Sequence, residues 1–184
     1  AKGGGFTSRL IFAYGDSVEA LTSYKDTPVC AAERALRMNY QAQDGQQYQL
    51  NLIDTPGHVD FGYEVSRSLA ACEGALLVVD ATQGIQAQTL SNYEKAKQLG
   101  LTIIPVLNKI DLPSSDVEGV ILDLMEMLHI NEEDVVLVSA KTGMNIDKLL
   151  ETIVAKIPAP QGNPDNPPRG LIFTSKYDQH KGVI

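Results

Sequence analysis

Short runs of aliphatic residues alternate along this chain with stretches whose apolar residues recur every three or four positions. Three of the runs, residues 75–79, 103–107 and 135–138, are apolar at every position. Strands buried on both faces of a parallel sheet have this texture, whereas half-exposed strands alternate in polarity. We therefore predict three buried parallel strands at these positions.

Helical spacing occupies the intervals between and after these strands. Helices are predicted over residues 86–99, 117–128 and 145–157, and the last two place their apolar side chains on one stripe. Residues 63–72 have a spacing compatible with a shorter helix that ends at Gly74. Short buried strands that alternate with amphipathic helices predict an α/β domain with a doubly wound, mostly parallel sheet.

Residues 36–53 are predicted to form a hairpin ahead of these elements. Residues 37–43 alternate weakly in polarity, Asp44-Gly45 suits a two-residue turn, and residues 48–53 form an apolar second strand. A polar loop follows the second strand directly, so this strand, rather than the first, is the one that can position candidate functional residues.

Five prolines follow the last predicted helix and interrupt all periodicity, because proline neither continues a helix nor sits inside a sheet. We therefore predict one domain over residues 1–157 and a linker over residues 158–169. Residues 171–174 and 183–184 are typical of strands, which indicates the start of a different, all-β unit over residues 170–184.

The composition is that of a soluble globular protein with one core. With 43% hydrophobic and 21% charged residues, the chain matches neither disordered nor membrane-embedded proteins. Its longest apolar runs fall far short of the roughly 20 residues that cross a bilayer. Residues 1–5 lack the features of a signal or transit peptide, so the sequence does not support targeting.

Cysteine usage and charge limit the ligands. Cys30 and Cys72 share neither a close spacing nor a histidine cluster, which argues against a zinc site and favours a reducing, cytosol-like compartment. The formal charge of −8 disfavours sequence-independent binding to DNA or to any other nucleic-acid backbone, because such binding requires a basic face.

Polar loops follow three of the predicted strands. In doubly wound sheets, ligands bind beyond the carboxyl ends of the strands, so we expect these loops to share one edge and one ligand. The loops are Asp54-Thr55-Pro56-Gly57-His58, Asn108-Lys109-Ile110-Asp111 and Ser139-Ala140-Lys141.

The second and third loops have the groups to recognise a purine base. Asn108 and Asp111 supply an amide and a carboxylate, which fit a base edge with an acceptor beside adjacent N–H donors, as guanine has and adenine lacks. The stem of Lys109 can cover the base plane, and the main-chain N–H of Ala140 can reach a base carbonyl. A buried Asp111 left unpaired by the wrong base would cost about 1–3 kcal/mol, which gives selectivity.

The first loop suits the phosphate end of a nucleotide. Asp54 can hold Mg²⁺ through water, because hard cations prefer oxygen ligands and keep part of their hydration shell. Gly57 has no Cβ and lets the backbone approach a phosphate closely. His58 follows directly, where its side chain can orient a water molecule for in-line attack.

In this chain order, the three loops resemble the third, fourth and fifth signature motifs of GTP-binding proteins. His58 directly after the glycine is similar to translational GTPases, whereas Ras-like proteins carry glutamine there. Longer strings resemble the elongation factor 4 (LepA) family, and the end of the chain resembles the start of that family's second, β-barrel domain. The strings are residues 54–61, 63–71, 75–81 and 108–113, the resemblance runs from about residue 38 to the end, and residues 1–35 diverge.

The resemblance implies a P-loop-NTPase-like G domain, incomplete at its N-terminus, that binds GTP or GDP with Mg²⁺ and hydrolyses GTP. It implies that His58 is catalytic, that Asp54 holds Mg²⁺ through water, and that all three loops contact the nucleotide. It also implies a cytoplasmic bacterial translation elongation factor that acts on the ribosome, or an organellar one if the parent protein belongs to a mitochondrion or plastid.

Two departures separate the chain from this family. It has no G-x-x-x-x-G-K-[ST] loop, whose backbone N–H groups and lysine hold the β- and γ-phosphates. Cys30 stands where the family has a magnesium-binding threonine.

Arg9, Leu10 and Tyr14 resemble the helix after the missing loop. The strand before that loop lies in the middle of the sheet in this architecture, and its loss would remove about 10 kcal/mol of apolar burial. Either residues 5–14 substitute for this strand, or the chain is a fragment that folds poorly.

The missing loop keeps two other hypotheses open beside a GTP-hydrolysing factor. The first is a non-catalytic module that binds guanine nucleotide or another protein. The second is a truncated or degenerate chain with no activity of its own. Binding of labelled GDP in the presence of magnesium separates these hypotheses.

Overall fold

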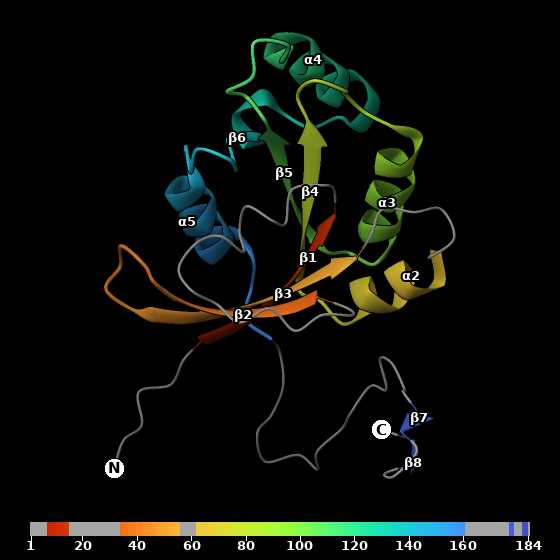
Figure 1. The fold of residues 1–184 in the computed structure, drawn as a ribbon, viewed down its shortest axis with the longest axis vertical. Helices are drawn as coiled ribbons and strands as arrows, with labels where there is room; N and C mark the ends of the chain where they lie inside the picture. Colours follow the sequence, from red (N-terminus) through yellow and green to blue (C-terminus); the bar gives the residue numbers. More distant parts are fainter. Residues whose placement is uncertain (1–6, 15–33, 56–61, 161–176, 179–181, 184) are drawn as a thin grey trace.

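A six-stranded sheet with strand order β2-β3-β1-β4-β5-β6 forms the centre of the fold (Figure 1). Neighbouring strands are parallel except for the antiparallel pair of β2 and β3. This sheet confirms the prediction of an α/β fold with a mostly parallel sheet. The strands are β1 (Thr7–Tyr14), β2 (Arg34–Gln41), β3 (Gln47–Thr55), β4 (Gly74–Asp80), β5 (Thr102–Asn108) and β6 (Val136–Leu137).

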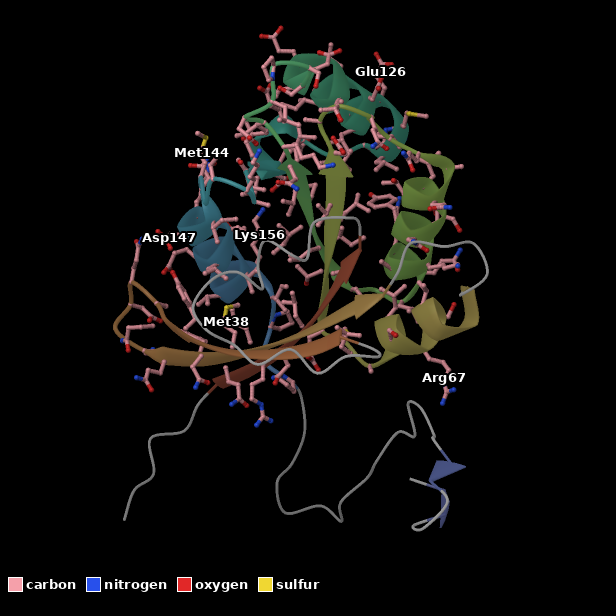
Figure 2. The ribbon with its side chains drawn as sticks, in the orientation of Figure 1. Met38, Arg67, Glu126, Met144, Asp147 and Lys156 are labelled. Atoms are coloured by element: carbon pink, nitrogen blue, oxygen red, sulfur yellow. The ribbon has the colours of Figure 1, made fainter. Side chains whose placement is uncertain are left out.

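Helices cover both faces of the sheet. The apolar side of α5 packs on one face, where Met38 of β2 points toward it (Figure 2). Side chains of α2, α3 and α4 pack against β3, β4 and β5 on the opposite face. The helices are α2 (Gly62–Ala70), α3 (Ala87–Gln98), α4 (Val117–Leu128) and α5 (Ile146–Lys156).

The computed structural model describes the backbone of residues 7–14, 34–55, 62–160, 177–178 and 182–183, and the side chains of residues 37–53 and 65–160. Beyond the predicted linker, β7 (Tyr177–Asp178) pairs antiparallel with β8 (Gly182–Val183). The strand predicted at residues 171–174 lies outside the described residues. The division into a domain, a linker and the start of a β-barrel stays a prediction. Within the described ranges, no helix has the length and apolar character that a bilayer span requires.

The N-terminal segment β1 is a central strand of the sheet. It lies between β3 and β4 and runs parallel to both, with Ile11 paired to Leu52 on one side and to Gly74 on the other. Residues 7–14 of the predicted segment therefore take the place of the missing central strand, as one of the two alternatives predicted. The resemblance of Arg9, Leu10 and Tyr14 to a helix is wrong, because these residues lie in β1. A place between two strands satisfies backbone groups on both sides of β1, and its isoleucine, phenylalanine and tyrosine favour strands.

The predicted two-residue turn of the hairpin is wrong. The ladder of β2 and β3 ends at the pair Gln41 and Gln47, which leaves residues 42–46 in the connection. A two-residue turn of the predicted type requires positive φ at both central residues, but here only Gly45 has it, with φ of 81°. Asp44 instead stabilises the longer loop, because its Oδ1 accepts a hydrogen bond from the Gln46 N–H at 2.8 Å.

Helix boundaries follow the predicted periodicity closely, with one correction at Gly74. The helix predicted to end there ends at Ala70, and Gly74 is instead the first residue of β4. A Cβ at this glycine would lie 2.6 Å from Cδ1 of Ile157, the residue that follows α5. Gly74 therefore lets the end of α5 pack closely on the start of a central strand.

A shared carboxylate joins α5 to the β2–β3 hairpin. Glu151 Oε1 accepts hydrogen bonds from the Tyr40 hydroxyl at 2.5 Å and from the Gln43 main-chain N–H at 2.9 Å. Hydrogen bonds to a charged group contribute about 1.5–3 kcal/mol. We therefore expect Glu151→Ala to lower the free energy of unfolding by about 2 kcal/mol in urea denaturation. If the exposed control Glu133→Ala is equally destabilising, this hydrogen-bonded contact does not stabilise the fold.

Candidate functional site

The carboxyl ends of the parallel strands lie at one edge of the sheet. Asn108, the last residue of β5, pairs in register with Asp80, the last residue of β4. Thr55, the last residue of β3, pairs with Tyr14, the last residue of β1. In Figure 1, the arrowheads of β4 and β5 mark this edge and point toward α4. The three polar loops predicted to share a ligand therefore begin at the same edge, because each follows a strand of this parallel set.

Asn108 joins the second and third loops directly. Its side chain is only 2% exposed, and its Oδ1 accepts a hydrogen bond from the Ala140 N–H at 3.0 Å. The strands beneath bring the loops together, since the Val138 N–H donates to the Leu107 carbonyl at 2.8 Å. An amide buried at a strand end and bonded to the neighbouring loop fixes the relative position of both loops.

Lys109 contacts a residue that the sequence argument did not select. Its Nζ lies 2.6 Å from Oδ2 of Asp80, and Asp80 Oδ1 accepts hydrogen bonds from the N–H and hydroxyl of Thr82 at 2.8 and 2.7 Å. A signal for Asp80 was present in the sequence, because Asp80 is the first polar residue after the apolar run at residues 75–79. The rule that selected the other three loops therefore also selects this fourth one.

The remaining predicted residues of the second and third loops differ in their surroundings. Ser139 is fully buried, and its Oγ accepts a hydrogen bond from the Thr142 N–H at 3.2 Å, which closes the third loop into a turn. Lys141 is exposed and Asp111 is half-buried. Within the described part of the chain, the Asp111 carboxylate has no hydrogen-bond or ion-pair partner. The Asp111 carboxylate can therefore pair with a ligand without first breaking a contact to another described residue.

The first loop is described only in part. Asp54 and Thr55 are the last residues of β3, but their side chains are not among those described, and Pro56, Gly57 and His58 lie outside the described residues. Among the described side chains, no three histidine, cysteine, aspartate or glutamate residues gather closely enough to hold a metal ion. The magnesium role of Asp54 and the catalytic role of His58 therefore stay predictions.

The Ala140 N–H has a partner that sequence reasoning did not foresee. The prediction gave this donor to a base carbonyl, whereas in the structure it donates to Asn108 Oδ1. The same hydrogen bond orients the Asn108 amide, with its oxygen toward Ala140. A base carbonyl that approaches Ala140 must share this N–H with Asn108 or displace the amide oxygen.

The Asp80 carboxylate should make stability depend on pH. Burial raises the pKa of Asp80, but hydrogen bonds from Lys109 and Thr82 outweigh burial and hold the pKa below its ordinary value. Between the lowered and the ordinary pKa, the unfolded chain binds more protons than the folded one, so stability rises with pH. Wild type should therefore have a higher free energy of unfolding than Asp80→Asn. This difference should be fully present above about pH 4 and should be lost as the pH falls through the lowered pKa of Asp80.

Chemical denaturation of both proteins at pH 6.5 and at pH 3 measures this effect. Asp134→Asn is the control, because Asp134 also forms an ion pair, with Lys156 at 2.6 Å. Hydrogen bonds from Lys156 and Asn131 also lower the pKa of Asp134, but its side chain is 41% exposed against 16% for Asp80, so water screens its ion pair more. The difference in stability between wild type and Asp134→Asn should therefore change less between the two pH values. A gap between wild type and Asp80→Asn that does not narrow at pH 3 would contradict a stabilising charge at Asp80.

Comparison with known proteins adds a family and several close relatives. A family model described as the elongation factor Tu GTP binding domain matches residues 20–159. Elongation factor 4 of Chlorobaculum tepidum is 57% identical over 160 residues, which are 87% of this chain and 26% of that protein. Elongation factor 4 of Clostridium kluyveri is also 57% identical over 160 residues, covering 87% and 27%. The chain spans about a quarter of the length of these curated relatives.

A solved structure agrees with the observed fold. Era, in complex with MgGDPNP and nucleotides 1506–1542 of 16S ribosomal RNA, superposes with a TM-score of 0.65 and 20% sequence identity. The match covers 89% of this chain and 60% of the Era chain. At this identity the likeness shows the fold alone, and it supports the α/β arrangement described above.

Proposed function

Since this chain belongs to the family of the elongation factor Tu GTP binding domain, we propose that its parent protein is a GTP-hydrolysing translation elongation factor that acts on the ribosome. The relatives named elongation factor 4 support this choice within the family. We further place the protein in the bacterial cytoplasm, or in a mitochondrion or plastid if the parent is organellar. The chain covers only part of such a protein, and we propose ribosome binding for the whole parent protein.

The observation that carries this proposal is the hydrogen bond from the Ala140 N–H to the buried Asn108 amide. It holds the loops at residues 108–111 and 139–141 together at the carboxyl edge, where doubly wound sheets bind ligands. In the proposed complex, guanine lies against these two loops. Its N–H donors face the Asp111 carboxylate, the stem of Lys109 covers the base plane, and Asn108, Ser139, Ala140 and Lys141 shape the rest of the pocket.

We place the phosphates at the ends of β1 and β3. Asp54 would hold Mg²⁺ through water, the Thr55-Pro56-Gly57 segment would approach the γ-phosphate, and His58 would orient the attacking water. The water oxygen would then bond to the γ-phosphorus as the bond to the bridging oxygen breaks and the water gives up a proton, which yields GDP and inorganic phosphate. Magnesium, when bound, would offset the charge that develops on the phosphate oxygens.

The phosphate end lacks one family feature. Tyr14, the last residue of β1, pairs with Thr55, the last residue of β3, at the proposed phosphate end. In the related factors a lysine-containing glycine loop holds phosphates, and this sequence has no such motif. We therefore expect the base-binding half of the site to contribute a larger share of the affinity than it does in a complete G domain.

Titration of the chain with fluorescently labelled GDP and Mg²⁺ tests the proposal. Unlabelled GDP should displace the label and ADP should not, because only guanine pairs with the Asp111 carboxylate. Phosphate release from GTP, with His58→Ala as the inactive control, then tests hydrolysis. Displacement by ADP and GDP alike, or no binding at all, would reject the proposed nucleotide site. Guanine-specific binding without phosphate release would leave the non-catalytic binding module as the function of this chain.

A further inference from the structure

We propose that Asp80 is a positioning residue for base recognition, which holds the Asn108–Asp111 loop in its binding shape through the Lys109 ammonium. This inference rests on the proposed nucleotide site and adds a residue from a fourth loop, which begins where β4 ends. Asp80, the last residue of β4, pairs in register with Asn108, the last residue of the neighbouring strand β5. Its carboxylate is therefore placed to restrain the loop that leaves β5.

The turn after β4 gives the Asp80 carboxylate a fixed position. The Asp80 carbonyl accepts hydrogen bonds from the N–H groups of Gln83 and Gly84 at 3.1 and 2.9 Å. Thr82 donates both its N–H and its hydroxyl to Asp80 Oδ1. The Ala81 N–H donates to the Asn108 carbonyl at 2.9 Å, which connects the turn to the end of β5. With Oδ1 held by Thr82, Oδ2 is directed to Lys109.

The base-binding loop needs such a restraint at Lys109. This residue has φ of 66°, a left-handed conformation that is unfavourable for a side chain with a Cβ. The ion pair with Asp80 immobilises the side chain at its far end, with Nζ 2.6 Å from Oδ2. A lysine held at both ends in this way has lost part of its conformational freedom before any ligand arrives, which lowers the entropy cost that binding would otherwise have.

The loop is thus anchored on both sides. The turn after β4 holds Lys109 through Asp80, and the turn after β6 holds Asn108 through the Ala140 N–H. Asp111, the group that would distinguish guanine, follows two residues after Lys109 and has no such anchor among the described residues. The placement of its carboxylate therefore depends on the conformation of the residues before it.

Asp80→Asn tests this inference in the full chain. The amide keeps an oxygen for Thr82 but removes the charge and presents a donor to the Lys109 ammonium. We expect about tenfold weaker GDP binding, because a partly buried charge-assisted pair is lost. Asp134→Asn is the matched control, since it breaks an ion pair of the same length that joins η2 (Glu132–Asp134) to Lys156 of α5. GDP affinity should be unchanged in this control.

A double-mutant cycle distinguishes positioning from general destabilisation. If Asp80 acts through Lys109, Asp80→Asn should weaken GDP binding in wild type but cause no further loss in the Lys109→Met background. Equal losses in both backgrounds would overturn the inference, as would an Asp80→Asn variant that binds GDP as tightly as wild type.

Amide hydrogen exchange separates failure of the inference from failure of the proposed function. If wild type binds no GDP, the proposed nucleotide site is rejected, and exchange without ligand decides the role of Asp80. The Ala81 and Ala140 amides both donate to Asn108 and should exchange several-fold faster in Asp80→Asn, while amides of α5 do not change. Unchanged exchange at both alanines would overturn the positioning role of Asp80.

Discussion

Replacing Asp111 with asparagine should shift the base preference from guanine toward xanthine by about 10- to 100-fold. The carboxylate accepts from the adjacent N–H donors of guanine, whereas an asparagine amide also presents a donor. Xanthine carries a carbonyl oxygen where guanine has its amino group, so it pairs with that donor. An unpaired polar group in the site costs about 1–3 kcal/mol, which corresponds to the stated range.

Competition of GDP and XDP against a labelled nucleotide measures this shift. Asp123→Asn is a suitable control, because Asp123 is an exposed carboxylate on α4 with the same charge. This variant should keep the preference of wild type. An Asp111→Asn protein that still prefers GDP over XDP by the wild-type ratio would remove Asp111 from base recognition.

Proline at Ile11 should abolish cooperative folding. Ile11 lies in β1, which pairs with β3 on one side and β4 on the other, so a break here separates the hairpin from the rest of the sheet. Proline removes a backbone donor and is excluded from central strands, and the strand carbonyl that loses its hydrogen bond costs about 1–3 kcal/mol. Losing the register of a central strand adds to this and exceeds what a domain with about 5–15 kcal/mol of stability tolerates.

Circular dichroism during urea or thermal denaturation would detect the loss as a missing cooperative transition. Ile11→Val keeps a β-branched side chain and the backbone donor, so it should cost at most about 1.5 kcal/mol and retain the transition. A cooperative transition in Ile11→Pro, close to that of wild type, would mean that β1 is not required between β3 and β4.

The predictable parts of this fold are those in which local pattern and tertiary packing agree. Residues 117–128 were predicted as a helix from one apolar stripe, and α4 has those bounds. The buried strands β4 and β5 likewise follow from continuous apolar runs. In such segments the spacing of the apolar residues indicates which side chains are buried, and this burial stabilises the element.

β1 could not be assigned in this way. Its segment resembles a helix of the related factors in a few residues, and its role as a strand depends on two partners that lie far along the chain. The site shows the same limit. The Asn108–Ala140 hydrogen bond and the Asp80–Lys109 ion pair join residues about 30 positions apart, and only the sheet register brings them together. Sequence motifs identified the loops, but not the contacts that hold them.

Chemical-shift mapping of backbone amides tests the proposed nucleotide site most directly. On addition of GDP with Mg²⁺, the amides of Lys109, Asp111 and Ala140 should shift together and saturate with a single affinity, while ADP at the same concentration should leave them in place. If GDP and ADP shift these amides equally, or if GDP perturbs only residues away from the carboxyl edge of the sheet, guanine does not bind between the two loops.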